Sequence, residues 1–347
     1  MALMTTDAPA LPDWDKLSFS LTQTDTIFEC FGDLDSDPQW DEGAFKPFEN
    51  VSISPAATIF SYGLSIFEGL KAERTEDGKI LLFRVDRNAW RFGHSATQLR
   101  MLNFPEKRFI TAVTELVRRN ERFIPPAGKG TLYVRPTLFA DEPQLGLRTA
   151  RRYRVLMYAS PVGAYFSSAD AGVRLRVLEQ GRVAPGGTGS AKAAGNYAGS
   201  LNRREQMHVE GFDDVLFLDA RDAQFATETT GSNVFAKLKN GILVTPKLND
   251  QILPGITRES VIQLAKEQLG LTVEERPLRI EEILGDVSEL FCTGTAWTVR
   301  PVRELQYRDE ITKFDAPDVA VQLLQSLRAI QSGEAPDRFE WIREVAL

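Results

Sequence analysis

A run of fifteen residues in the middle of the chain, 186–200, consists almost entirely of small side chains around one lysine, Lys192, and one tyrosine, Tyr197. Small side chains let the backbone and a bulky ligand approach each other closely, and glycine permits the turns that a packed ligand imposes. No carboxylate neighbours the lysine in sequence, since the nearest are Glu179 and Glu205. Enclosure without an acidic partner favours the neutral amine over the ammonium ion, and a neutral amine is a nucleophile.

Carbonyl chemistry is natural for such an amine, above all a Schiff base with an aldehyde cofactor such as pyridoxal phosphate. Two other interpretations use the same residues. Composition alone is equally typical of a flexible glycine-rich loop with a solvated lysine. A phosphate-binding P-loop needs glycine directly before the lysine and serine or threonine directly after it. Ala191 and Ala193 occupy those positions, which argues against the P-loop.

Length and charge limit the classes of partner. The chain has 347 residues, enough for two domains of about 150 residues each. Its 41 basic and 48 acidic side chains give a net charge of −7, which argues against nucleic acid or an anionic membrane as partner. No apolar run approaches the roughly 18 residues of a membrane span. The acidic N-terminal region is not typical of a signal peptide, so we expect a cytoplasmic protein.

Cysteine and histidine are scarce. Cys30 and Cys292 cannot form a disulfide framework and are typical of a reducing compartment. His94 and His208 are too few for a Cys/His zinc site or a histidine-based triad, so we expect no metal. Acid–base chemistry then depends on Lys, Tyr, Asp and Glu side chains.

The first half of the chain predicts a mixed domain. Residues 1–50, rich in Asp, Pro and Phe, are interpreted as an irregular arm packed on the body. The N-terminal domain is expected to cover 51–162. Its predicted elements are a hairpin at Asp77-Gly78, helices over 87–102 and 107–123, and strands over 130–140 and 153–160.

The second half predicts another mixed domain, over 178–347, after an interdomain loop placed at 163–177 because its first part is polar and rich in small residues. The elements expected from 173 onward are strands over 173–179, 214–219, 232–238, 242–245 and 291–297, helices over 199–208, after 255 and over 317–332, and a polar tail.

Three further segments have functional interpretations. The turn at Pro254-Gly255 leads into a helix, whose free N–H groups suit a phosphate. Glu228, among small hydroxyl residues, is a candidate partner for a pyridine nitrogen. Arg135, beside Tyr133 on a strand, is either a surface arginine or an inward anion-binding group. Taken alone, each is more typical of ordinary structure.

Together, seven segments resemble the branched-chain amino acid aminotransferases, whose fold is shared with D-amino acid aminotransferases and aminodeoxychorismate lyases. In order along 48–334 they are YGLSIFEGLKA (62–72), YVRPT (133–137), SPVGAYF (160–166), GGTGSAKAAGNY (186–197), ETTGSN (228–233), LPGITR (253–258) and TGTA (293–296). The resemblance implies a mixed α/β (α+β) protein of fold type IV. A smaller N-terminal α/β domain, a larger C-terminal domain with a pseudo-barrel sheet and an active site between them are expected.

The resemblance also implies the cofactor, pyridoxal 5′-phosphate, and residue roles. Lys192 would hold it as a Schiff base and shuttle a proton between the substrate Cα and the cofactor's C4′. Tyr197 would bind its phenolic oxygen, and Glu228 would pair with its ring nitrogen. Arg91 is the expected phosphate arginine, because it lies three residues before His94. The expected cofactor ligands besides the first three are Arg91, Gly255, Ile256, Thr257 and Thr295.

The implied reaction is reversible, ping-pong transfer of the amino group of leucine, isoleucine or valine to 2-oxoglutarate. Arg135 would receive the second carboxylate of glutamate. The expected substrate-binding residues are Tyr62, Phe67, Tyr133, Arg135, Tyr165, Gly231, Thr295 and Ala296. The resemblance further implies a homodimer whose pocket residues are shared across an interface near Tyr62 and 163–177.

Some positions depart from the family pattern. Trp297 and Arg300 replace a CxxC pair of animal relatives, so no thiol redox control is expected. Gln23 stands where relatives often have an aromatic residue, which puts substrate preference in doubt. The alternatives on the same fold are a D-amino acid aminotransferase or an aminodeoxychorismate lyase, which usually lack the long arm and the YVRPT strand. The alternative of another class is a protein that binds phosphate or a nucleotide without covalent chemistry.

Overall fold

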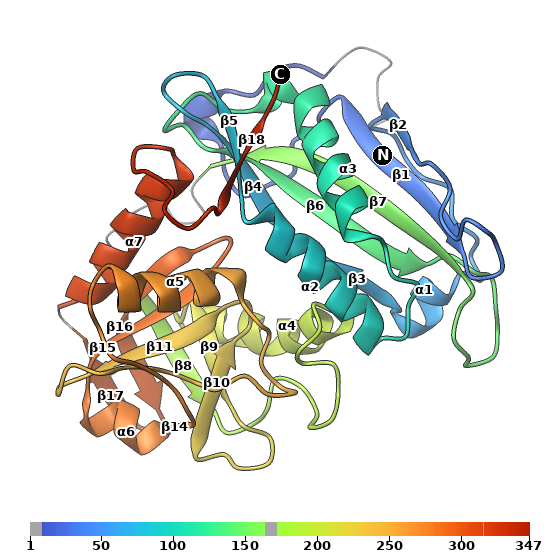
Figure 1. Cartoon of the computed structure of the whole chain (residues 1–347). Helices are drawn as coiled ribbons and strands as arrows, with labels where there is room; N and C mark the ends of the chain where they lie inside the picture. The colour runs from blue at the N-terminus through green and yellow to red at the C-terminus, as the bar shows by residue number, and fades with distance from the viewer. Residues whose placement is uncertain (1–8, 164–171, 315) are drawn as a thin grey trace. The chain divides into compact units, whose positions relative to one another are not determined.

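The computed structural model describes all residues except 1–8, 164–171 and 315. The chain divides into two compact units (Figure 1). The first comprises Met1–Tyr165, Ala191–Ala194 and Ile330–Leu347, and the second comprises Phe166–Ser190 and Gly195–Ala329. The N-terminal unit is the larger one, contrary to expectation, because both the arm and the end of the chain pack on it. No helix in the described ranges is long and apolar enough to cross a membrane.

The first unit is built on one antiparallel sheet. Its central pair joins β6 (Thr131–Ala140) along its whole length to β7 (Arg152–Val162), from Thr131↔Val162 to Ala140↔Tyr153. Leu132 and Val134 are buried on one face of β6, as the alternation of side chains predicted. The sheet order is β18 (Ile342–Val345), β5 (Ile80–Phe83), β4 (Leu70–Arg74), β6 (Thr131–Ala140), β7 (Arg152–Val162), β1 (Thr26–Asp33) and β2 (Ala44–Pro47), with β3 (Ser65–Phe67) paired to β6.

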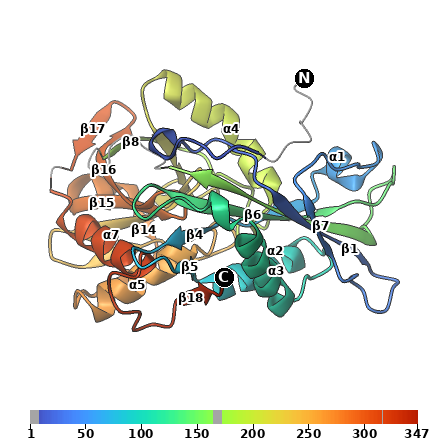
Figure 2. The ribbon, with the colours of Figure 1, turned by 90° about the horizontal axis from the view of Figure 1, so that it is seen from above.

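Two long helices pack on this sheet, as Figure 2 shows from above. They are α2 (Val85–Gln98) and α3 (Glu106–Arg119), which confirm the helices predicted from hydrophobic periodicity. The buried side chains of α3 include Phe109, Val113 and Leu116. The short elements of the unit are α1 (Thr58–Tyr62) and two 3-10 helices, Trp14–Lys16 and Glu121–Phe123.

Two expectations for the ends of the chain are wrong. The arm is not irregular throughout, because β1 lies inside the first sheet between β7 and β2, with Ile27, Phe28 and Cys30 buried. The polar tail ends in β18, which pairs with β5 and buries Val345. Both segments gain their hydrogen bonds from strands far away in sequence, which local composition does not reveal.

The second unit contains a closed barrel. Strands β11, β15, β16, β8, β9 and β10 pair in that order, and β10 pairs back to β11 through Glu228↔Asn233. The barrel confirms the pseudo-barrel sheet expected for this half of the chain. Its strands, with those that extend the sheet, are β8 (Val173–Leu178), β9 (Asp214–Leu218), β10 (Phe225–Thr229), β11 (Asn233–Leu238), β12 (Leu243–Thr245), β13 (Val273–Glu275), β14 (Leu278–Arg279), β15 (Val287–Gly294), β16 (Thr298–Tyr307) and β17 (Glu310–Lys313).

The strands of this unit bury a second core, which includes Leu175, Leu216 and Val234. The helices are α4 (Ala194–Val209), α5 (Ile256–Glu267), α6 (Ile280–Gly285) and α7 (Asp318–Gln331). Helix α5 confirms the helix predicted after Gly255.

Three local predictions in this half need correction. Residues 173–177, assigned to the interdomain loop, belong to β8, because their apolar side chains alternate into the barrel. Glu228 lies within β10, a strand that is missing from the predicted ones. Tyr197 lies in the first turn of α4, which begins five residues earlier than predicted because the small residues after Lys192 are helical.

Candidate active site

Lys192 belongs to the first unit, where hydrogen bonds on both sides fix its backbone. Its N–H donates to Ser95 Oγ at 2.9 Å, and its carbonyl oxygen accepts from the N–H of Phe67 at 3.1 Å. The next residue, Ala193, forms a bridge with Ile66 of β3. The lysine therefore sits on β3 and α2, not on a flexible loop.

The side chain of Lys192 is half-buried and lies over an aromatic ring. Its Nζ is 4.7 Å from the ring centroid of Phe67. The guanidinium carbon of Arg135 is 4.8 Å from the same centroid, and Arg135 Nη2 donates to the hydroxyl of Tyr133 at 3.1 Å. The structure thus brings together Lys192, Phe67, Tyr133 and Arg135, four residues that the sequence placed in the site. Arg135 points to this cluster, which favours an anion-binding role over that of a surface arginine.

Arg91 is buried in the same unit and has a partner that sequence reasoning missed. Its Nε donates to Glu68 Oε1 at 2.7 Å and its Nη2 to Glu68 Oε2 at 2.9 Å, a bidentate pair. Asn88 Nδ2 also donates to Glu68 Oε2, at 2.7 Å. The only sign of Glu68 was its place inside the segment YGLSIFEGLKA.

Of two further predicted substrate residues, one makes a hydrogen bond to a residue outside that cluster and the other cannot be placed. Tyr62 is 42% exposed, and its hydroxyl donates to the carbonyl oxygen of Leu145 at 2.7 Å. Tyr165 falls outside the described residues.

In the second unit, Glu228 is a buried carboxylate with several donors. It is 3% exposed. Its Oε1 is 2.6 Å from Arg182 Nη2, and its Oε2 accepts from Asn233 Nδ2 at 3.2 Å and from the N–H of Leu253 at 3.2 Å. Arg182 was not predicted, because a single arginine in a loop carries no sequence signal.

The turn at Leu253 leads directly into the predicted phosphate site. Gly255 is the N-cap of α5 and provides no side-chain cap, while Ile256 and Thr257 are buried in the first turn. The first N–H groups of a helix have no partner within it. A Cβ on Gly255 would lie 2.0 Å from Asn233 Oδ1, so only glycine fits against this amide.

Other predicted residues of this unit lie on neighbouring turns. Thr295 and Ala296 follow β15 and are half-buried. A Cβ on Gly294 would lie 3.2 Å from the carbonyl oxygen of Gly231, so the two turns are in contact. Tyr197 is half-buried in α4, whose first turn is tied back to the loop by the hydrogen bond from Thr188 Oγ1 to Asn196 Oδ1 at 2.7 Å.

These residues fit pyridoxal phosphate. Glu228 offers a buried acid for a ring nitrogen, and the first turn of α5 offers uncapped N–H groups for a phosphate. Thr293 Oγ1 is buried without a hydrogen-bond partner among the described residues, so a bound group could satisfy it. In the first unit, Lys192 offers an amine over an aromatic ring.

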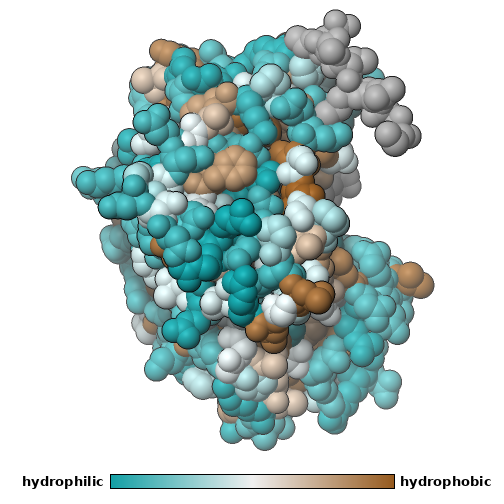
Figure 3. Space-filling model, turned by 90° about the vertical axis from the view of Figure 1, so that its right-hand side faces the viewer, coloured by the Kyte–Doolittle hydropathy of each residue, from teal (hydrophilic) through white to brown (hydrophobic). Residues whose placement is uncertain are grey.

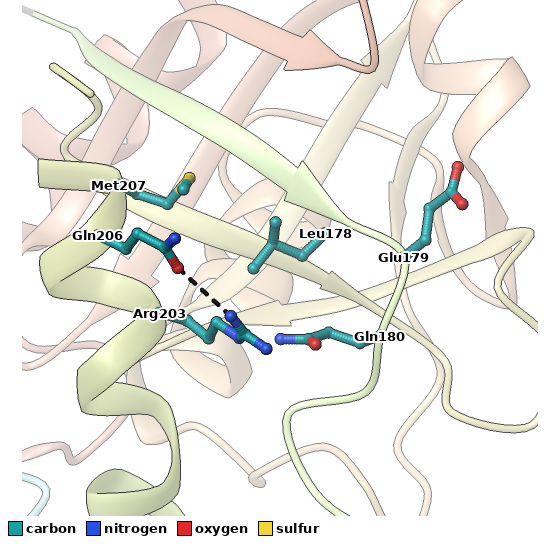
Figure 4. Close-up of a pocket in the computed structure, with 6 residues that line it drawn as sticks. All are labelled: Leu178, Glu179, Gln180, Arg203, Gln206 and Met207. Atoms are coloured by element: carbon teal, nitrogen blue, oxygen red, sulfur yellow. Dashed lines mark hydrogen bonds between the residues drawn. The ribbon is translucent and has the colours of Figure 1, made fainter. Parts of the chain in front are cut away.

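A pocket of about 350 Å³ lies elsewhere in the second unit, between α4 and the end of β8 (Figure 4). Leu178 and Met207 contribute apolar side chains, while Arg203 donates to Gln206 Oε1 at 3.3 Å. None of the predicted site residues lines it. We assign the chemistry to the residues above, because the pocket contains neither a buried acid nor a lysine.

The chain matches the amino-transferase class IV family over residues 65–305. It is 39% identical over 343 residues to branched-chain-amino-acid aminotransferase 5, chloroplastic, of Arabidopsis thaliana, a match that covers 97% of this chain and 81% of the relative. It is 39% identical over 344 residues to branched-chain-amino-acid aminotransferase 2 of Bacillus subtilis (strain 168), with 96% and 94% covered.

A solved structure also resembles this chain. The branched-chain amino acid aminotransferase of Thermobaculum terrenum in its PLP-form superposes with a TM-score of 0.78 at 25% identity, covering 94% of this chain and 99% of that one. The chain belongs to the class IV aminotransferases and, within that class, to the branched-chain-amino-acid aminotransferases. The predicted fold class, enzyme class and pyridoxal phosphate cofactor are confirmed, and the alternative functions are not supported.

Proposed function

We propose that this enzyme transfers the amino group of leucine, isoleucine or valine to 2-oxoglutarate by a ping-pong route. The observation that carries the proposal is the position of Arg135, whose guanidinium lies beside the rings of Phe67 and Tyr133. Such a pocket must accept an aliphatic side chain in one half-reaction and a carboxylate in the other. One arginine among aromatic walls meets both requirements.

Bound pyridoxal phosphate supplies an aldehyde and an electron-withdrawing ring. Lys192 would hold the aldehyde through its amine, and the same amine would move the proton at the substrate Cα. Glu228 would accept a hydrogen bond from the ring nitrogen, and Tyr197 would bind the phenolic oxygen. Arg91 and the turn formed by Gly255, Ile256 and Thr257 would hold the phosphate, and Thr295 would be a further cofactor ligand.

The substrate α-carboxylate is bound by the N–H groups of Thr295 and Ala296 and by the hydroxyl of Tyr62. Phe67, Tyr133 and Tyr165 wall the side-chain pocket, and Gly231 leaves room for the substrate. Support for the turn at 295–296 comes from its half-buried residues and from Gly294, which directly precedes it and packs against Gly231.

Gln23 widens the range of amino donors toward methionine and aromatic amino acids. Its Nε2 donates to the carbonyl oxygen of Phe48 at 2.9 Å, so the amide is held in one orientation. A pocket wall with an amide in place of an aromatic ring leaves more room for a long side chain.

The enzyme is a homodimer that shares pocket residues between subunits. Phe60 is 61% exposed, and Leu145 and Leu147 are 95% and 82% exposed, all in α1 or the loop that contacts it. Hydrophobic side chains otherwise occur in small groups on a mostly hydrophilic surface, as the face in Figure 3 shows. A second copy of the chain would cover these leucines, and light scattering of the eluted protein tests the dimer.

The cytoplasm is the proposed location, and biosynthesis of branched-chain amino acids the proposed setting. Both cysteines are free and buried, which suits a reducing compartment. The Arabidopsis thaliana relative is named as chloroplastic, whereas the name of the Bacillus subtilis one gives no compartment.

One spectrum of the purified protein tests the proposed function. With pyridoxal phosphate bound to Lys192, the protein has an absorbance band in the visible that changes on addition of L-leucine. A panel of amino donors with 2-oxoglutarate then ranks leucine, isoleucine, valine, methionine, phenylalanine and D-alanine. A colourless protein, or a preference for D-alanine, would refute the assignment.

A further inference from the structure

We propose that Arg182 is a positioning residue that keeps Glu228 ionised and correctly oriented for the cofactor's ring nitrogen. This inference rests on the proposed role of Glu228. Arg182 follows β8, and its Nη2 lies 2.6 Å from Glu228 Oε1. Each side chain is 4% exposed, so the pair is shielded from solvent.

The position of Arg182 is fixed from several directions within the second unit. Its Nη2 also donates to the carbonyl oxygen of Gly189 at 3.3 Å. Gly189 packs so tightly that a Cβ there would lie 2.5 Å from the carbonyl oxygen of Asp250. A Cβ on Gly181 would lie 2.4 Å from the Cβ of Ala220. Both loop segments that hold the arginine are therefore in close contact with the body of the unit.

The carboxylate is oriented by three donors from different segments. Arg182 binds Oε1, while Asn233 and the N–H of Leu253 donate to Oε2. Asn233 Nδ2 also donates to the carbonyl oxygen of Leu253 at 3.0 Å, which ties β11 to the turn before α5. Asn233 and Leu253 are neutral donors, so of these three contacts Arg182 provides the positive charge.

That charge determines where a shared proton resides. A carboxylate buried without a cation is driven toward its neutral, protonated form, whereas a guanidinium remains charged at all ordinary pH values. With Arg182 beside it, Glu228 stays anionic, and the proton between the acid and a ring nitrogen remains on the nitrogen. Without Arg182, that proton moves to Glu228, and the ring loses the charge that makes it an electron acceptor.

The test compares Arg182→Gln, Arg182→Lys, Glu228→Gln and the double variant Arg182→Gln/Glu228→Gln with the wild type. The matched control is Arg174→Gln, which removes an arginine of β8 whose Nη2 is 2.8 Å from Glu304 Oε1. The dissociation constant of pyridoxal phosphate, the pH titration of the visible band, and kcat and KM for leucine are measured for each protein.

Arg182→Gln is expected to weaken pyridoxal phosphate binding about 10-fold and to lower kcat about 10- to 100-fold, the range typical of residues that orient a ligand's direct partner. KM for leucine should change less than about twofold, because the proposed substrate contacts are untouched. The pH midpoint of the visible band should shift in the same direction as in Glu228→Gln. Arg182→Lys, which keeps the charge, should restore most of that shift, and Arg174→Gln should behave like the wild type.

The double variant separates this role from a merely structural one. If Arg182 acts through Glu228, the double variant matches Glu228→Gln in its spectrum, cofactor affinity and kcat. This comparison stays valid if Arg182→Gln alone fails to fold, because the double variant removes the charges of both members of the pair together. Independent, multiplicative effects of the two substitutions would overturn the inference, as would a folded Arg182→Gln with the titration of the wild type. A wild type without any visible band would instead refute the proposed function itself.

Discussion

A Cβ atom on Gly69 would lie 1.9 Å from the hydroxyl oxygen of Tyr133 and 2.7 Å from its Cζ. Gly69 is buried just before β4, and the neighbouring Lys71 pairs with Tyr133 across the sheet. The tyrosine hydroxyl reaches its place beside Arg135 only because residue 69 has no side chain.

Gly69→Ala should therefore displace the Tyr133 ring and disturb the proposed pocket. We expect KM for leucine to rise about 10-fold, and the free energy of unfolding to fall by about 1–3 kcal/mol, as is typical of overpacking. Steady-state kinetics and urea unfolding measure both. Gly285→Ala is the control, since no atom lies within 4 Å of a Cβ there. Equal kinetics in the two variants would remove Tyr133 from the pocket.

Lys192→Ala should abolish turnover and the visible band, because no other amine is proposed to hold the cofactor. The fold should persist, since the hydrogen bonds to Ser95 and Phe67 involve only the backbone of residue 192. Circular dichroism and the leucine assay together test this. Lys79→Ala, at a surface ion pair with Asp77, is the control. Substantial activity in Lys192→Ala would mean that another residue is the nucleophile.

Glu68→Gln should destabilise the first unit, because it removes the negative charge that forms a buried, bidentate ion pair with Arg91. Breaking such a buried pair costs about 3–5 kcal/mol. Glu115→Gln removes a partly exposed acid paired with Arg118 and should cost less than about 1 kcal/mol. Urea unfolding of both variants gives the comparison, and equal losses would show that burial of the Glu68 pair contributes no extra stability.

Asp214→Asn should change how stability depends on pH. Burial raises the pKa of the Asp214 carboxyl above its ordinary value of 3.8. The folded protein thus binds this proton more tightly than the unfolded chain, so the contribution is fully present below pH 3.8 and is lost as the pH rises through the raised pKa.

As the pH rises from 3.8 through the raised pKa of Asp214, the free energy of unfolding of the wild type should fall relative to that of Asp214→Asn. The fall should be at most about 1.4 kcal/mol per pH unit. Unfolding curves from about pH 4 to about pH 8 measure the difference between the two proteins. Curves that run parallel over this range would show that Asp214 does not titrate there.

Local sequence patterns were sufficient for much of the fold. Helix α3 was predicted because Val113 and Leu116 repeat at helical spacing, and β6 because apolar and polar residues alternate. The wrong predictions for the two ends of the chain share one physical cause. Strands β1 and β18 are stabilised by β7 and β5, which are distant in the chain, and no local pattern specifies such a partner.

The site residues also separate into those that local sequence predicts and those that only the fold reveals. Lys192, Phe67 and Arg135 stood out in sequence because of unusual neighbours or a matching motif, and the structure places them around one ring. Their supporting residues could not be predicted. Glu68 and Arg182 are ordinary charged residues in sequence, and only the fold shows that each is paired with a buried partner.

The pairing Glu228↔Asn233 closes the barrel of the second unit, and the same two residues carry the proposed acid and the amide that orients it. Formation of the pair between β10 and β11 therefore completes the barrel and also fixes the position of the acid. Hydrogen exchange at the seam between β10 and β11 should therefore slow when pyridoxal phosphate binds.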